Sequence, residues 1–76
     1  MATKAFILIE TVVGKTKQVA STLQQLKGVE SADCVTGPYD VIAVVEGENL
    51  NEIGVLITDK IHPVAGISRT VTCLAI

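Results

Sequence analysis

The stretch TGPYDVIAVVEG, from Thr36 to Gly47, places a turn directly before an almost unbroken apolar run. Pro38 presets φ for a turn and Gly37 supplies backbone freedom, so this segment predicts a hairpin between two strands. Residues 41–45 are all apolar, and successive residues of a strand point to opposite faces of a sheet. We therefore expect the second strand of the hairpin to be apolar on both faces.

Helical spacing of apolar residues predicts two helices around this hairpin. Apolar residues recur at i, i+4 and i+7 within residues 15–27, and Gly28 follows where a left-handed residue ends a helix. The second helix is expected to begin at Asn49, because Glu52 completes a capping-box-like pattern, and to end before Pro63. Its apolar stripe is predicted to contain Leu50, Ile53, Ile57 and Ile61.

The order of the predicted elements is βαββαβ, the ferredoxin-like arrangement of the α+β class. In this fold two helices cover one face of a four-stranded antiparallel sheet. The chain has 76 residues, which is the size of one domain, and contains no linker or low-complexity segment. The strands are predicted at residues 4–12, 29–36, 40–46 and 67–75.

Consecutive apolar residues in two strands predict a dimer. Residues 6–9 and 41–45 are apolar at successive positions, hence on both faces, whereas two helices cover only one face. At roughly 25 cal/mol per Å² of apolar area, exposure of the other face would cost a small domain several kcal/mol. We expect a two-fold symmetric dimer that packs sheet against sheet as an α+β barrel-like sandwich. The alternative is a monomer with a modestly apolar open face.

Composition argues against several classes of protein. The net charge is −2, the pI is about 5.1, and Lys and Arg are scattered singly, so no basic face for direct nucleic-acid binding is expected. No apolar stretch reaches the roughly 18 residues that span a bilayer. Cys34 and Cys73 lack CxxC spacing, which favours a cytoplasmic protein in which both are buried small hydrophobes. The single His62 and the lack of an acid cluster predict no metal site, and no cofactor is expected.

Residues 26–53, LKGVESADCVTGPYDVIAVVEGENLNEI, resemble the ligand-binding C-terminal half of the Lrp/AsnC family of amino-acid-responsive regulators. The matching elements are Gly28-Val29 after the first helix, Val35-Thr36-Gly37 before the turn, Tyr39-Asp40 at the next strand, and the helix that begins at Asn49. The likeness extends in element order over residues 1–76, but no helix-turn-helix precedes the first strand. The chain therefore looks like a stand-alone RAM domain (regulation of amino-acid metabolism) without a DNA-binding domain.

The resemblance implies dimers that assemble further into rings, such as octamers or decamers, with small effectors such as amino acids bound near the GxYD loop. In such a site Gly37 lets a ligand carboxylate approach backbone amides, Asp40 accepts the ligand's ammonium, and Tyr39 offers a ring and a hydroxyl. The alternative for this loop is ordinary hairpin chemistry, with Asp40 bonding turn amides. The expected ligand-binding residues are Thr36, Gly37, Tyr39 and Asp40, with Thr70 and Thr72 from the last strand of a facing subunit.

The sequence is compatible with two candidate functions, which belong to different classes of protein. The first is a non-enzymatic regulatory module that binds an amino acid and modulates transcription or metabolism through a partner, such as a full-length Lrp/AsnC-type regulator. The second is a small dimeric α+β barrel enzyme, which would need an acid or base such as His62 or Tyr39. An ACT-like domain is disfavoured because the protomers of such domains pair edge to edge, which would leave the second apolar face of this sheet exposed. A heavy-metal-binding domain is disfavoured because the chain lacks a CxxC motif.

Overall fold

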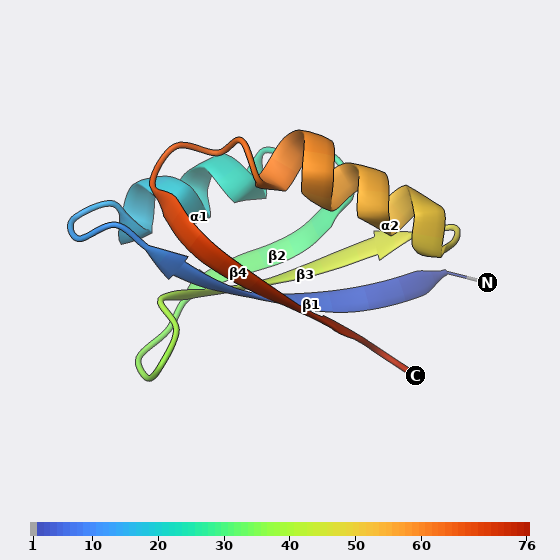
Figure 1. Cartoon of the computed structure of the whole chain (residues 1–76), viewed down its shortest axis with the longest axis horizontal. Helices are drawn as coiled ribbons and strands as arrows, with labels where there is room; N and C mark the ends of the chain where they lie inside the picture. Colours follow the sequence, from blue (N-terminus) through green and yellow to red (C-terminus); the bar gives the residue numbers. More distant parts are fainter. Residues whose placement is uncertain (1) are drawn as a thin grey trace.

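The computed structural model describes residues 2–76 as a four-stranded antiparallel sheet with both helices on one face (Figure 1). The strands lie in the order β2-β3-β1-β4, and each neighbouring pair is antiparallel. This confirms the ferredoxin-like α+β fold. The elements are β1 (Thr3–Thr11), α1 (Thr16–Gln24), β2 (Val29–Cys34), β3 (Val41–Gly47), α2 (Leu50–Leu56), the π-helix η1 (Ile57–Ile61) and β4 (Ile67–Leu74).

The hydrophobic core lies between the helices and one face of the sheet. Alternate residues of the two central strands are buried there, since strand side chains change face at every position. α1 and the second helix cover these residues with side chains at helical spacing. The fully buried large side chains are Ile7, Ile9, Val19, Leu23, Val41, Val45, Ile53 and Ile61.

The other face of the sheet, here called the open face, is also apolar. Phe6 pairs with Val44 and Leu8 pairs with Ile42, and these positions alternate with the buried ones. Phe6 is 38% exposed, and both helices lie on the opposite side of the sheet (Figure 1). The prediction that both faces are apolar is thus confirmed. The register adds β4 residues, so the apolar residues of the open face are Phe6, Leu8, Ile42, Val44, Val71 and Cys73.

The second helix begins as predicted but has a narrower apolar stripe. The Asn49 side chain accepts a 2.9 Å hydrogen bond from the Glu52 amide, which confirms the N-cap. Ile53, Ile57 and Ile61 are buried, whereas Leu50 is 59% exposed. Assigning Leu50 to the core stripe was wrong: the buried residues recur every four positions from Ile53 onward, whereas Leu50 is the first residue of α2 and is exposed at the end of the helix.

The four-residue spacing also accounts for the π-helix. In an α-helix of 3.6 residues per turn, residues spaced by four drift around the axis. In η1 the amide of His62 bonds to the carbonyl of Ile57 at 2.8 Å, an i to i+5 pattern with a wider turn. The wider turn offsets the drift and keeps both Ile57 and Ile61 buried over the sheet.

Three other sequence predictions need correction. The first helix ends at Gln24 and β2 ends at Cys34, so both elements are shorter than predicted. Cys34 and Cys73 are exposed rather than buried, because both lie on edge strands of the sheet. Within residues 2–76, no helix has the length and apolarity needed to cross a membrane.

Candidate functional site

The loop at residues 36–40 joins β2 to β3, at the end of the sheet where β1 finishes. The amide of Val35 donates a 2.9 Å hydrogen bond to the carbonyl of Asp40, which closes the predicted hairpin. Gly37 has a φ of +136° and is exposed, as is Thr36, while Tyr39 is half-buried. The positive φ explains why glycine occupies this position, because a Cβ strains the backbone in this region. The loop thus presents backbone groups and one aromatic ring to solvent.

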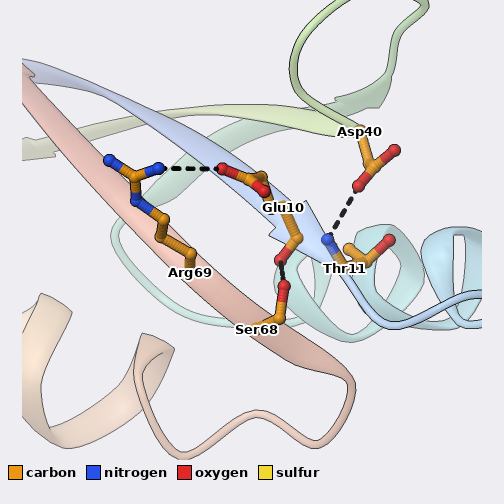
Figure 2. Close-up of polar contacts among 5 residues, drawn as sticks. All are labelled: Glu10, Thr11, Asp40, Ser68 and Arg69. Atoms are coloured by element: carbon orange, nitrogen blue, oxygen red, sulfur yellow. Dashed lines mark hydrogen bonds and ion pairs between the residues drawn. The ribbon is translucent and has the colours of Figure 1, made fainter.

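Asp40 ties this loop to β1. Its amide donates a 2.9 Å hydrogen bond to the carbonyl of Ile9, and its carboxylate Oδ2 accepts a 2.8 Å hydrogen bond from the Thr11 amide (Figure 2). The carboxylate therefore bonds a backbone amide, as the hairpin alternative expected, but that amide belongs to β1 rather than to the turn. Among residues 2–76, no donor bonds the other oxygen, Oδ1. One carboxylate oxygen thus fixes the side chain, and the second has no hydrogen-bond donor among the described residues.

Beside Asp40, an ion pair joins β1 to β4. The Arg69 guanidinium lies 3.4 Å from the Glu10 carboxylate, and the Ser68 hydroxyl donates a 3.0 Å hydrogen bond to the Glu10 carbonyl (Figure 2). The Arg69 side chain is 67% exposed and that of Glu10 is 37% exposed, so solvent screens the pair and its contribution to stability is small. Sequence reasoning missed this contact because its partners are 59 residues apart and have no local signature. Only the pairing of β1 with β4 reveals it.

Thr70 and Thr72 lie elsewhere in the same protomer. They pair with Ile9 and Ile7, which are buried under the helices, so both threonines are on the helix side of the sheet. β1 lies between β3 and β4, which separates them from Asp40. The Thr70 hydroxyl lies 3.3 Å from His62 Nε2. One protomer therefore brings together the loop residues but not the two threonines.

At the far end of β3, the carboxyl group of Glu30 interacts with that of Glu46. The side-chain hydrogen bond with Glu46 raises the pKa of Glu30 above its ordinary value of 4.5, burial and the Glu46 charge raise it further, and Lys4 partly opposes the shift. Asp40 directly precedes this strand and Glu46 is its next-to-last residue, so the pair is remote from the loop. In the part of the chain that the structure describes, no group of three or more His, Cys, Asp and Glu residues is placed to hold a metal ion.

Known proteins share this fold and this sequence pattern. The chain is 32% identical over 78 residues to an uncharacterised HTH-type transcriptional regulator of Pyrococcus abyssi, covering 99% of this chain and 52% of that protein. It thus spans about half the length of the curated relatives it matches. A crystal structure of the hypothetical protein PHS023 from Pyrococcus horikoshii superposes with a TM-score of 0.92 at 38% identity, covering 100% of this chain and 90% of that one.

A more distant structure shares the fold alone. It is a transcriptional regulator of Neisseria meningitidis in complex with L-Met, with 16% identity and a TM-score of 0.85, covering 97% of this chain and 49% of that one. The family model of the Lrp/AsnC ligand binding domain matches residues 4–76, which is nearly the whole chain. The βαββαβ fold agrees with that match. The chain therefore belongs to the Lrp/AsnC ligand-binding domain family.

Proposed function

We propose that this chain is an oligomeric regulatory module that binds an amino acid at the loop of residues 36–40. The observation that carries the proposal is the Asp40 carboxylate, which Thr11 holds through Oδ2 and whose Oδ1 has no hydrogen-bond donor among residues 2–76. The family match supports a ligand-binding role, and a relative of the same fold was crystallised with L-Met. In this proposal Oδ1 accepts the ligand's ammonium, because charge-assisted hydrogen bonds are among the stronger polar contacts.

The rest of the loop fits the remaining parts of an amino acid. Gly37 has no neighbouring atom within 4 Å of its would-be Cβ, so a carboxylate can approach the exposed backbone amides of the turn. Tyr39 is half-buried and offers its ring to a ligand side chain. Thr36 is exposed beside Gly37 and adds a hydroxyl. These four residues are the protomer's own contribution to the proposed site.

The open face supports assembly into dimers. Its apolar centre is flanked by the charged residues Lys4 and Glu46 at one end and Glu10 and Arg69 at the other. Such a patch is complementary to a second copy of itself, so we expect a two-fold dimer that buries both faces. Because Thr70 and Thr72 lie on the helix side, a neighbouring dimer must supply them to the site. This arrangement requires further assembly, such as an octameric or decameric ring.

The proposed role is regulatory rather than catalytic. The relatives are named as transcriptional regulators, and the elements of residues 2–76 correspond to the ligand-binding half of such proteins. We therefore expect the module to act in the cytoplasm through a partner that carries a DNA-binding element, for example a full-length regulator of the same family. A ligand shifts the assembly only through its differential affinity for the assembled and dissociated forms.

Light scattering after size exclusion, with and without each of the twenty amino acids, tests the proposal together with calorimetric titration. We expect an oligomer larger than a dimer that binds at least one amino acid. Asp40→Asn retains an acceptor for Thr11 but lacks the charge, so it is expected to weaken binding while leaving the oligomer intact. A monomer that binds none of the twenty contradicts both the assembly and the ligand.

A further inference from the structure

The turn between β1 and α1 holds two apolar side chains in solvent. Val13 is 97% exposed and Val12 is 50% exposed. The Val12 amide donates a 2.8 Å hydrogen bond to the carbonyl of Gly66, and the Lys15 amide donates a 3.0 Å hydrogen bond to the carbonyl of Val12. Figure 1 shows this turn projecting from one end of the molecule. Because the turn is already fixed by hydrogen bonds, its apolar tip can be buried by a partner with little loss of backbone freedom.

A hollow lies at the opposite end of β1. It has a volume of about 500 Å³ and is bordered by Ala2, the end of β3, the turn after α1, and α2 with η1. β1 begins beside this hollow and ends at the Val12-Val13 turn. The strand has nine residues, so its length of roughly 26 Å, at about 3.3 Å per residue, separates the two features. One protomer therefore cannot place its own turn in its own hollow.

The wall of the hollow is mostly apolar. Val55 is 51% exposed on α2, and Leu56 beside it packs against Gly28, whose would-be Cβ lies 3.0 Å from the leucine side chain. Gly28 also has a φ of +96°, so a side chain there is strained as well as crowded. The glycine thus lets the turn after α1 lie close to α2 and form one side of the hollow.

The charged residues that line the hollow are more acidic than basic. Three carboxylates and two ammonium groups leave one net negative charge. Beyond this lining, Glu46 also faces Glu30 on β2 and pairs with Lys4 on β1, and these two neighbours have opposite formal charges. The charged lining residues are Lys27, Glu46, Glu48, Glu52 and Lys60.

The charges around the Val12-Val13 turn have the opposite balance. Lys15 and Lys17 follow the turn and are exposed, and Asp40 approaches it through its hydrogen bond to the Thr11 amide. Two lysines and one aspartate leave one net positive charge. Within residues 2–76 the only ion pair joins Arg69 to Glu10 at this end of the sheet, and that pair neutralises itself. The turn is thus an apolar tip with a basic surround, complementary to an apolar hollow with an acidic surround.

We propose that the Val12-Val13 turn of one copy of this chain inserts into the hollow of the next copy. Val13 packs against Val55 and Leu56, while Lys15 and Lys17 lie towards the glutamates of the hollow. The two surfaces differ and lie at opposite ends of β1, so the contact is heterologous and joins copies head to tail. The inference rests on the assembly beyond a dimer proposed above and names the contact that produces it.

The small size of the turn determines how such a contact acts. A two-residue tip covers far less than the roughly 800 Å² per partner of a standard interface, so one contact alone is weak. A head-to-tail series that closes into a ring repeats the contact at every copy, and the combined affinity then exceeds that of one contact. The contact is therefore expected to hold together sheet-to-sheet dimers rather than isolated protomers.

Cysteine cross-linking between two variants tests the contact directly. Both variants are made in the Cys34→Ser/Cys73→Ser background, which removes the native thiols. Val13→Cys protein is mixed with Val55→Cys protein and oxidised by dissolved oxygen with copper phenanthroline. We expect a disulfide between positions 13 and 55, identified by peptide mass spectrometry, at least fivefold more abundant than with the control partner. That control is Ser21→Cys, which is exposed on α1.

Light scattering of point variants tests whether the contact maintains the assembly. Val13 is nearly fully exposed, so Val13→Ser is expected to stay folded by circular dichroism and to lower the mass from a larger oligomer to a dimer. Val55→Ser is expected to have the same effect, because it removes the apolar wall. Val13→Ile is the matched control, since it keeps an apolar tip and is expected to retain the mass of the unaltered chain.

The outcomes separate this contact from the function proposed for the loop. An unchanged mass in Val13→Ser, or cross-linking at position 55 no stronger than at position 21, overturns the contact and leaves the proposed oligomer standing. An unaltered chain no larger than a dimer overturns the contact together with the proposed further assembly. Calorimetric titration of the same samples with amino acids reports separately on binding at the Asp40 loop.

Discussion

The Asp40 carboxylate accepts a 2.8 Å hydrogen bond from the backbone amide of Thr11, a residue 29 positions earlier in the chain. The bond is partly buried and joins the start of β3 to the end of β1, two strands that are already paired. It fixes one carboxylate oxygen and orients the other. The same side chain therefore has a structural role and the role proposed for it in ligand binding.

Two substitutions of Asp40 separate these roles. Asp40→Ala leaves the Thr11 amide without its acceptor, so we expect the free energy of unfolding to fall by about 1–2 kcal/mol, with weakened amino-acid binding. Asp40→Asn keeps an oxygen acceptor and is expected to retain more of the stability while losing the affinity. Urea denaturation and calorimetric titration measure the two effects. Unchanged affinity in Asp40→Asn contradicts the ammonium contact.

Adjacent valines of β3 distinguish the open face from the core. Val45 is fully buried under the helices, so Val45→Lys is expected to abolish folding, because an unpaired charge in the core is strongly destabilising. Val44 pairs with Phe6 on the open face, so Val44→Lys is expected to remain folded and to lose dimerisation. Circular dichroism reports the fold and light scattering reports the mass. A folded and fully dimeric Val44→Lys variant rules out sheet-to-sheet packing.

Two glycines are expected to respond to alanine with opposite signs. Gly37 has a φ of +136°, so Gly37→Ala strains the loop and is expected to lower the free energy of unfolding by about 1–3 kcal/mol. Gly54 lies within α2 with no neighbour within 4 Å of its would-be Cβ, so Gly54→Ala is expected to raise it by about 1 kcal/mol. Thermal or urea unfolding measures both changes. Equal changes in the two variants are inconsistent with the described backbone.

The Glu30 and Glu46 pair predicts a pH dependence of stability. Because the pKa of Glu30 in the folded chain is raised above 4.5, first by its hydrogen bond to Glu46, the folded state holds this proton more tightly than the unfolded state. The resulting stability is present at low pH and is lost as the pH rises from about 4.5 through the raised value. Glu30→Gln keeps a neutral partner for Glu46 and is expected to flatten this decline. Urea midpoints across this range, compared with Glu48→Gln as control, test the pair.

Local patterns in the sequence determined most of the fold. Alternation in the strands, helical spacing and the Asn49 cap predicted the six elements in order, because each depends on residues a few positions apart. The consecutive apolar residues 41–45 predicted that the face of the sheet opposite the helices is also apolar and is buried by a partner. The bounds were less accurate, and the π-helix escaped prediction, because it depends on how Ile57 and Ile61 pack on the sheet rather than on propensity.

The arrangement of the candidate site was decided only by the tertiary structure. The sequence identified Gly37, Tyr39 and Asp40 as one loop, since they are adjacent in the chain. It contained no sign that Asp40 bonds Thr11, and none that Lys27 and Lys60 border one hollow. These contacts depend on which strands pair, in which register, and on how the helices cross the sheet. Such relations arise from the packing of the whole chain, which no local pattern encodes.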